Sequence, residues 1–429
     1  MRFYSKIICL IVVSVLFVSG CGKKPEQQNK LVVWHWLNDR KDALDQLAEK
    51  YTEQTGIEVE FKLFFPPDIY AQKVIAAARA GNLPDIFGIL AEKLTIASFV
   101  QAGHIPNLLP YMNADYGRWK NSFYPQTLDV VSFQENNTYG APAGIYGVPI
   151  DTAIMQFVYN KALFKKSGID PDTPPTTINE FINYANVIRK DSHVYGFTCG
   201  WGESWMLNCL VTEWAINVMG EEKFLKTISG EIPYTDEEWI EVFSLFEKLR
   251  RSGILAPNVT ALYNKESEDS FARGKAAFSF NGSWSVNVYR QLNPSLDYAF
   301  FPLPAVSTKH PVKVWGGGGS SFMVNAKSPR KEKAINFLKW ITAQQQQKFL
   351  AKETNNLPAI RLSKEDLPEM LQTTIDDLGK STHPNVWPHN EDSRVIEALN
   401  KGLQQVVMGI KTAQQIAKEI QEVNIRVSK

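Results

Sequence analysis

Between residues 31 and 103, short apolar stretches alternate with longer amphipathic ones, and this alternation constrains the fold more than any other feature. The apolar stretches have the length and composition of strands, and each is followed by apolar residues at helical spacing. The strand-like segments are 31–34, 57–64 and 84–87, and the helical ones are 39–56, 68–81 and 91–101. A β-α-β-α-β-α order predicts a parallel sheet covered by helices, with any functional crevice at the carboxyl ends of the strands.

The middle of the chain repeats this pattern with different lengths. Strands are expected at 156–160, 195–198, 277–280 and 322–325, and helices at 177–189, 205–218, 236–251, 329–343 and 395–429. The run Gln344–Gln347 is expected to be the exposed end of a helix. A chain of 429 residues is too long for one ordinary core, so two domains are expected. The helical tail that returns after both sheets predicts that the chain crosses between them more than once.

The first twenty residues differ from the rest. Arg2 and Lys6 precede an apolar run, residues 7–20, which is typical of a secretory signal and too short to span a bilayer as a helix. The run ends in Val-Ser-Gly directly before Cys21, which resembles the bacterial lipobox, where the signal is cut and the cysteine is lipid-modified. Residues 21–30 would then be a polar tether that holds the folded body off a membrane.

Charge and cysteine content exclude some classes of function. Without residues 1–20 the chain has 44 basic and 45 acidic side chains, a net charge of −1, so no global field draws it to nucleic acid. With Cys9 removed and Cys21 modified, Cys199 and Cys209 remain. They could form a disulfide in an exported chain or stay as two buried thiols, and the sequence does not decide between these alternatives.

Signatures of enzymes are missing from the sequence. It has no phosphate-binding loop, no HExxH, no GxSxG and no CxxC, and its six histidines lack metal-ligand spacing. Neither a metal nor a cofactor is expected. A glycosidase-like pair of carboxylates could still meet in the fold, which leaves an exported glycoside hydrolase as a weak alternative.

Several segments together resemble the extracytoplasmic solute-binding proteins of sugar-type ABC importers, the family that includes maltose- and glycerophosphodiester-binding proteins. The matching segments occur in the family's order: 81–86, 147–151 with 158–164, 174–177, 274–284, 334–338 and 357–359. One departure is Thr177, where the family usually has tryptophan, and we expect it to affect helix packing more than binding.

The resemblance implies an α/β, two-lobed fold of the periplasmic-binding-protein type II class. Each lobe would be a mainly parallel sheet flanked by helices, with the ligand cleft between the lobes. The expected N-terminal lobe comprises residues 31–150 and 305–345, and the expected C-terminal lobe comprises 151–304 and 346–429.

Candidate ligand-binding residues follow from this architecture. Trp284 comes directly after the strand end Asn281-Gly282, where it can face a cleft and stack on the apolar face of a sugar. Trp201 and Trp205 follow another strand and resemble the paired tryptophans of glycerophosphodiester-type relatives. Trp36 and Asn38 follow the first strand.

The remaining candidates come from the family pattern and from loop composition. Tyr70 and Glu92 match or adjoin positions where relatives touch substrate. Asp151 could bind ligand or latch the hinge, and Gly316 and Gly317 would let the backbone approach a ligand closely. Trp387 could close the pocket from the C-terminal segment.

The sequence therefore predicts a monomeric, exported lipoprotein on the cell membrane, facing the periplasm or the cell exterior. It would bind a carbohydrate by lobe closure and deliver it to the permease subunits of an ABC transporter, and only its lipid anchor would touch the membrane. The same fold could instead bind a glycerophosphodiester, a peptide or a polyamine.

Overall fold

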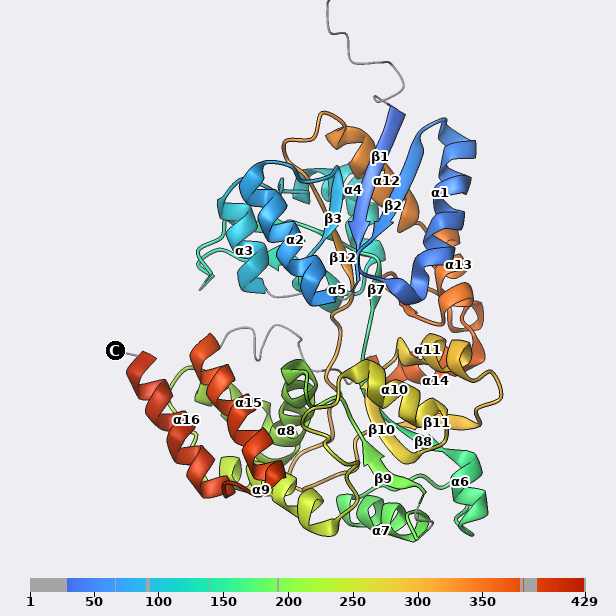
Figure 1. The fold of residues 1–429 in the computed structure, drawn as a ribbon. Coiled ribbons are helices and arrows are strands. Elements are labelled where there is room, and N and C mark those ends of the chain that lie inside the picture. The colour runs from blue at the N-terminus through green and yellow to red at the C-terminus, as the bar shows by residue number, and fades with distance from the viewer. Residues whose placement is uncertain are drawn as a thin grey trace, which may run out of the picture.

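The computed structural model describes residues 29–427 except 66, 90–92, 138, 191–192, 379–380 and 382–391. The chain forms two lobes stacked along one axis, each with its own sheet (Figure 1). We refer to residues 30–150 and 319–360 as the N-terminal lobe, and to residues 153–316 and 393–427 as the C-terminal lobe. The two-lobed α/β architecture predicted from the sequence is confirmed.

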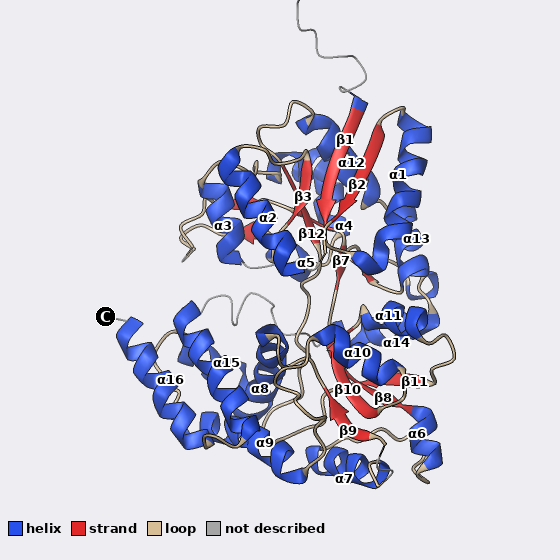
Figure 2. Ribbon diagram, in the orientation of Figure 1, coloured by secondary structure: helices blue, strands red, loops and turns tan. Residues whose placement is uncertain are grey.

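The N-terminal lobe contains a five-stranded sheet in the order β2-β1-β3-β12-β6, with helices on both faces (Figure 2). Its strands are β1 (Lys30–His35), β2 (Glu58–Leu63), β3 (Ile86–Gly88), β6 (Val148–Pro149) and β12 (Ser321–Val324). Its helices are η2 (Asn38–Arg40), α1 (Lys41–Thr55), α2 (Pro67–Ala80), α3 (Lys93–Gln101), α4 (Leu109–Ser122), α5 (Pro125–Asp129), α12 (Lys331–Ile341) and α13 (Gln344–Thr354). A short hairpin joins β4 (Ser132–Phe133) to β5 (Gly144–Ile145).

The C-terminal lobe contains a four-stranded sheet in the order β11-β8-β10-β9. Its strands are β8 (Met155–Asn160), β9 (Tyr195–Thr198), β10 (Ala276–Gly282) and β11 (Tyr298–Phe301). Its helices are α6 (Lys161–Lys166), α7 (Ile178–Ile188), α8 (Ser204–Ile228), α9 (Glu237–Ser252), α10 (Asn264–Ala272), α11 (Ser285–Leu292), α15 (Ser393–Met408) and α16 (Ala413–Val427). Helices α15, α16 and α9 pack together beside the sheet, as Figure 1 shows.

Local sequence explains where these elements begin and end. Helix α1 ends at Gly56, whose φ of 70° is left-handed and therefore suits glycine. Helix α7 begins with a capping box, in which the Thr177 hydroxyl accepts from the Glu180 N–H and the Glu180 carboxylate accepts from the Thr177 N–H. Thr177 is the residue that departs from the family's tryptophan, and its cap gives the departure a structural role.

The prediction that each lobe has a mainly parallel sheet is wrong, because both sheets are mixed in direction for a topological reason. β1 runs parallel to both β2 and β3, whereas β12 is antiparallel to β3 and β6. In the other lobe β10 is parallel to β9 but antiparallel to β8. Both β12 and β8 begin where the chain has just crossed from the other lobe, so they run opposite to strands that end at that edge.

Each lobe has its own apolar core, and the segments that pack into each core correct the predicted boundaries. The backbone of Val306 and Ser307 is held by Asn217 of α8, so the segment from residue 305 to 316 belongs to the C-terminal lobe. Helix α13 packs against α1, and Leu350 and Ile360 are in the N-terminal core. Residues 346–360 therefore belong to the N-terminal lobe. The chain leaves this lobe after residue 360 and not, as predicted, after residue 345.

A third apolar cluster lies at the junction of the lobes. It joins Ile154 and Val314, which are on the crossing segments, to Leu357 of the two-stranded pair β7 (Asp151–Thr152) and β13 (Leu357–Pro358). Leu371 and Leu378 of α14 (Glu369–Leu378) complete it, after the short helix η3 (Lys364–Asp366). The junction is therefore a packed structure of its own.

Two further sequence questions are answered by the described residues. Cys199 and Cys209 are buried free thiols, so the alternative without a disulfide holds. Within the described ranges, no helix combines the length and the apolar character needed to cross a bilayer.

Candidate functional site

The carboxyl ends of the central strands in the two lobes point toward each other. β8 begins directly after the crossing, and Gly282 at the end of β10 pairs with Met155 at the start of β8. β12 likewise begins directly after a crossing and is antiparallel to β3, so β3 and its parallel neighbour β1 end at the same edge. The segments that follow β1, β9 and β10 therefore meet at the inter-lobe space, where ligands bind in such folds.

Two tryptophans of the C-terminal lobe lie together at this edge. The ring centroids of Trp205 and Trp284 are 5.8 Å apart, with 51° between the ring planes. Trp205 is in the first turn of α8 and is 39% exposed, and Trp284 is partly buried ahead of α11. The Trp284 ring lies against Gly282, where a Cβ would come within about 2 Å of ring carbons, so glycine permits the ring to take this position.

A buried carboxyl supports this aromatic pair from below. Glu268 of α10 is 3% exposed and accepts hydrogen bonds from Asn264 Nδ2 at 3.0 Å and Asn281 Nδ2 at 3.1 Å. Burial raises the pKa of Glu268 to about 7, while hydrogen bonds from Asn281 and Trp284 and the charge of Lys265 act in the opposite direction. Asp39 of the other lobe adds a smaller increase, which places a second carboxylate near Glu268.

The N-terminal lobe contributes Trp36 after the end of β1. Its ring lies over Gly88 at the end of β3, and its centroid is 5.3 Å from that of Tyr70. Trp36 is partly buried, whereas Asn38, the first residue of η2, is exposed. Both residues are thus at the strand end that faces the other lobe, as the sequence predicts.

Two predicted ligand contacts, Tyr70 and Trp201, are instead buried within single lobes. Tyr70 is fully buried, and its hydroxyl lies 2.9 Å from the Trp34 carbonyl and 2.8 Å from the Gly88 carbonyl, and accepts from the Gly88 N–H. Trp201 is also fully buried and packs against Phe197 and Phe246 in the C-terminal core. The prediction that either ring faces a ligand is wrong for this structure, because neither has exposed surface.

Gly316 and Gly317 approach another chain segment closely, which is a different role from the one predicted. The segment 315–320 pairs with 150–155, through the Ala153 N–H to the Gly318 carbonyl at 2.8 Å and the Gly317 N–H to the Ala153 carbonyl at 3.0 Å. A Cβ on Gly316 would lie 2.5 Å from a methyl carbon of Ile154. The glycines thus permit two crossing segments to run side by side.

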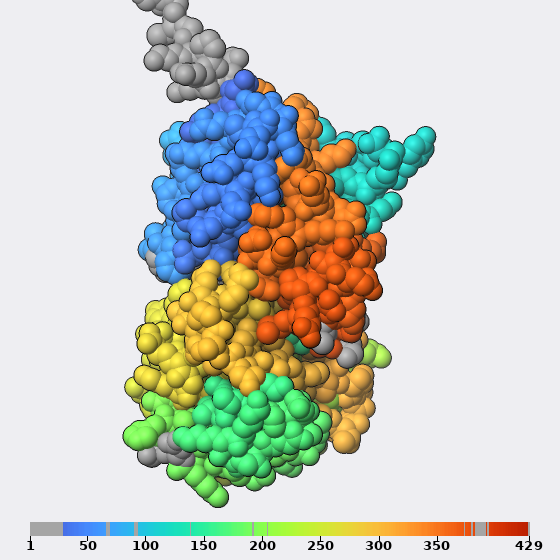
Figure 3. All heavy atoms as spheres, turned by 90° about the vertical axis from the view of Figure 1, so that its right-hand side faces the viewer, coloured from blue at the N-terminus to red at the C-terminus, as the bar shows by residue number. Residues whose placement is uncertain are grey.

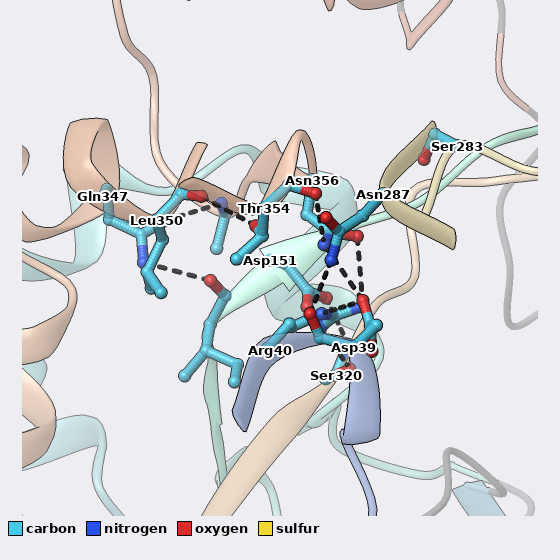
Figure 4. A network of polar contacts seen from close by, with 12 residues as sticks. Asp39, Arg40, Asp151, Ser283, Asn287, Ser320, Gln347, Leu350, Thr354 and Asn356 are labelled. Atoms are coloured by element: carbon cyan, nitrogen blue, oxygen red, sulfur yellow. Dashed lines mark hydrogen bonds and ion pairs between the residues drawn. The ribbon is translucent and has the colours of Figure 1, made fainter. Parts of the chain in front are cut away.

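The sequence suggested that Asp151 either binds ligand or latches the hinge, and in the structure its side chain makes contacts between the two crossing segments. Its side chain is paired with Arg40, and its Oδ1 accepts from the Ser320 N–H (Figure 4). Arg40 also donates to Ser320 Oγ at 3.0 Å and to Asn356 Oδ1 at 3.1 Å. A small cavity beside Arg40, lined also by Leu44, Gln347 and Leu350, has room for about one water molecule.

Direct contacts also join the lobes on the side of α10 and α11. Asn287 Nδ2 of α11 donates to the Asp39 carbonyl at 2.5 Å, and Arg290 donates to the Glu353 carbonyl. The Lys265 ammonium lies 5.9 Å from the centre of the Phe65 ring. Figure 3, which views this side, shows the residues coloured yellow against the blue and orange N-terminal lobe.

Three sequence-predicted residues, Cys21, Glu92 and Trp387, lie outside the described residues. Conversely, Glu268, Asn264 and Asn281 were not identified from the sequence as a cluster. Only Asn281, at the end of a strand, gave a signal in the sequence. Glu268 gave none, because a glutamate near the start of an acidic helix is usually exposed to solvent. Among the described residues, no group of three or more His, Cys, Asp or Glu side chains could hold a metal ion.

A family model described as bacterial extracellular solute-binding protein matches residues 46–373. The chain is 24% identical over 366 residues to the multiple sugar-binding protein of Streptococcus mutans, covering 81% of each chain. It is 22% identical over 329 residues to the sn-glycerol-3-phosphate-binding periplasmic protein UgpB of Escherichia coli, covering 75% of this chain and 70% of that one.

Solved structures share the whole fold. A chitin oligosaccharide binding protein superposes with a TM-score of 0.76 at 24% identity, over 93% of this chain and all of the other. Because this identity is low, the match establishes the two-lobed fold and leaves the choice of ligand to the residues of the site.

Proposed function

The chain belongs to the bacterial extracellular solute-binding protein family, and we propose that it binds a carbohydrate, either a sugar or an oligosaccharide, between its lobes. The bound ligand would be delivered to the permease subunits of an ABC importer. The relative from Streptococcus mutans, which is named as a multiple sugar-binding protein, supports this class of ligand.

The observation that carries the proposal is the Trp205–Trp284 pair at the strand ends of the C-terminal lobe. A sugar has an apolar C–H face that stacks on an indole, and hydroxyls at its edge that need hydrogen-bond partners. The pair offers the first and is held by the buried Glu268 carboxyl, which accepts from Asn264 and Asn281, while the exposed amide of Asn38 can offer the second. Trp36 and Asn38 would contact the ligand from the opposite lobe.

Binding would act through closure of the lobes, with no bond broken. The paired crossing segments, residues 150–155 and 315–320, form a narrow connection about which the lobes can rotate. A ligand that touches both strand-end surfaces favours the closed form, because only that form makes both sets of contacts. The permease would then recognise the closed form.

The lipobox-like segment before Cys21 supports attachment to the membrane by a lipid anchor. The family to which the chain belongs is one of extracellular proteins. We propose that the signal ends at residue 20, that Cys21 carries the lipid, and that the lobes act as a monomer on the outer side of the membrane.

A phosphate ester is a weaker candidate despite the similarity to UgpB. The Glu268 carboxyl lies beside Trp284, and a carboxylate there repels an anionic ligand. Arg40 is already committed to Asp151, Asn356 and Ser320.

Two measurements test the proposal. Native mass spectrometry of the purified protein would identify a co-purified ligand, and tryptophan fluorescence would be followed while chito-, malto- and galacto-oligosaccharides and monosaccharides are added. We expect one carbohydrate to shift the emission. Silence across all series would reject carbohydrate binding, and release of shorter products would instead identify a hydrolase.

A further inference from the structure

The short helix η2 ties the N-terminal lobe to the segments that connect the lobes (Figure 4). Its last residue, Arg40, pairs with Asp151 of β7 and donates to Ser320 Oγ on the second crossing segment at 3.0 Å. Arg40 also donates at 3.1 Å to Asn356 Oδ1, directly before β13, the strand that pairs with β7. All four side chains are buried. A movement of η2 therefore disturbs a buried polar network around the crossing segments.

The C-terminal lobe contacts η2 through one amide side chain. Asn287 of α11 donates from Nδ2 to the Asp39 carbonyl, and only 1% of Asn287 is exposed. Its Oδ1 accepts from Arg290 Nη2 at 3.0 Å, and Arg290 also donates to the carbonyl of Glu353, in α13 of the N-terminal lobe. Because Arg290 occupies the amide oxygen, the amide nitrogen of Asn287 is directed toward η2.

This contact lies between the proposed ligand site and the crossing segments. On the N-terminal lobe, Asp39 separates Asn38, which is exposed at the strand-end edge, from Arg40, which is bound to the crossing segments. On the C-terminal lobe, Asn287 is three residues after Trp284, which is about one turn of helix. The contact is therefore on the ligand side of the crossing segments, where parting of the lobes separates the two groups.

We propose that the Asn287–Asp39 hydrogen bond holds the lobes together before a ligand arrives, so that Asn287 sets the ligand affinity without touching the ligand. When the lobes part, water replaces the partner of each group, so the net contribution of the bond is small and the movement stays reversible. A ligand that requires the closed form binds more tightly in proportion to the fraction of molecules already closed. The effect on affinity rests on the proposed function, whereas the effect on the lobes does not.

Spin labels on the two lobes test this role directly. Ala76→Cys on α2 and Lys418→Cys on α16 are exposed positions for labels in the full-length protein, whose Cys199 and Cys209 are buried. Asn287→Ala should increase the distance between the labels in the absence of ligand. Its affinity for the carbohydrate that binds should fall about five- to tenfold, whereas the distance at saturating ligand should match that of the parent.

Two further variants separate this effect from a general loss of structure. Asn293→Ala removes a bond of the same kind, to the Ala272 carbonyl at 2.8 Å, but within the C-terminal lobe. It should leave the label distance unchanged and the affinity within about twofold. Arg290→Ala, at an exposed position, removes the bond that orients Asn287 and should change the label distance in the same direction as Asn287→Ala.

The label distances decide the outcome. An unchanged distance in unliganded Asn287→Ala overturns the proposal, and so does a shorter one, because the bond would then hold the lobes apart. An increase of the same size in Asn293→Ala overturns it too. Lower affinity with unchanged distances would show that Asn287 contacts the ligand, which also overturns it. If no carbohydrate binds, the proposed function fails, while the distances without ligand still decide the role of Asn287.

Discussion

Asn281, at the end of β10, donates a hydrogen bond of 3.1 Å to the carboxyl of Glu268 on α10, beneath the Trp205–Trp284 pair. This bond joins the end of β10 to α10. The first turn of α10 in turn contacts Glu203, just before Trp205. The aromatic pair that we propose as the ligand-stacking surface is thereby held by a buried polar group, whose protonation state should influence the stability of the C-terminal lobe.

Glu268→Gln should change how stability depends on pH. The pKa of Glu268 is about 7 in the folded protein, above its ordinary value, so the folded form holds a proton that the unfolded chain releases. The contribution of Glu268 is fully present below the unfolded pKa and is lost as the pH rises through about 7. The variant should therefore gain free energy of unfolding relative to the parent between about pH 5 and 8, by up to about 3 kcal/mol.

Denaturation curves at several pH values would measure this difference. The charged and titratable groups around Glu268 are Lys265 on the same helix, Tyr289 on α11, Glu203 beside Asn264, and Asp39 across the lobes. Glu222→Gln is a suitable control, because Glu222 is exposed on α8 and pairs with Lys226, which lowers its pKa. A pH-independent difference for Glu268→Gln would contradict the prediction.

Breaking the Arg40–Asp151 pair should destabilise the hinge strongly. Both side chains are buried, with 10% and 6% of their surfaces exposed, so removing the Asp151 charge leaves Arg40 buried with only the Asp39 carboxylate, 3.1 Å away, as an ionic partner. Asp151→Asn should lower the free energy of unfolding by about 3 kcal/mol. A double-mutant cycle with Arg40→Met measures the coupling, and we expect the double variant to be more stable than the sum of the single effects implies.

Additive effects of Arg40→Met and Asp151→Asn would show that the two side chains are energetically independent. Lys41→Met with Asp45→Asn provides the matched comparison, since that pair is exposed on the first turns of α1. It should show little coupling.

Tyr70→Phe should affect stability and leave ligand affinity unchanged. The Tyr70 hydroxyl accepts from the Gly88 N–H and donates to one of two carbonyls, those of Trp34 and Gly88, in a site without exposed surface. The variant leaves these backbone groups without that partner, which costs about 2 kcal/mol. Thermal denaturation and calorimetry on the same sample separate the two effects. A lower affinity at unchanged stability would restore the sequence-based assignment of Tyr70 to the ligand site.

Local pattern predicted the elements of residues 31–103 well, but it did not predict α4, α10, α11 or β11, nor the packing between elements. The alternation in residues 31–103 gave each strand and helix, because spacing of apolar side chains reports directly on local structure. Gln347 shows the limit. Expected at an exposed helix end, it is buried at the start of α13, where it donates to the Ile150 carbonyl and accepts from the Ala359 N–H. Such a role depends on which segments cross between lobes.

The tryptophans show the same limit at the site. Trp201 and Trp205 are four residues apart at one strand-to-helix turn, so the local sequence predicts the same environment for both. The structure buries Trp201 against Phe246 of α9 and leaves Trp205 beside Trp284. The difference comes from a helix more than 30 residues away in the chain, which no local pattern reports.

Ligand-induced fluorescence should distinguish these tryptophans. Trp205→Phe and Trp284→Phe should each reduce the emission change caused by a bound carbohydrate, and Trp284→Ala should lower affinity by about tenfold or more, because a stacking surface is removed. Trp201→Phe is the matched control. It should cost about 1 to 2 kcal/mol of stability through lost core packing, while the emission change and the affinity persist. If Trp201→Phe abolished the emission change and the other two variants preserved it, the ligand would not lie against the Trp205–Trp284 pair.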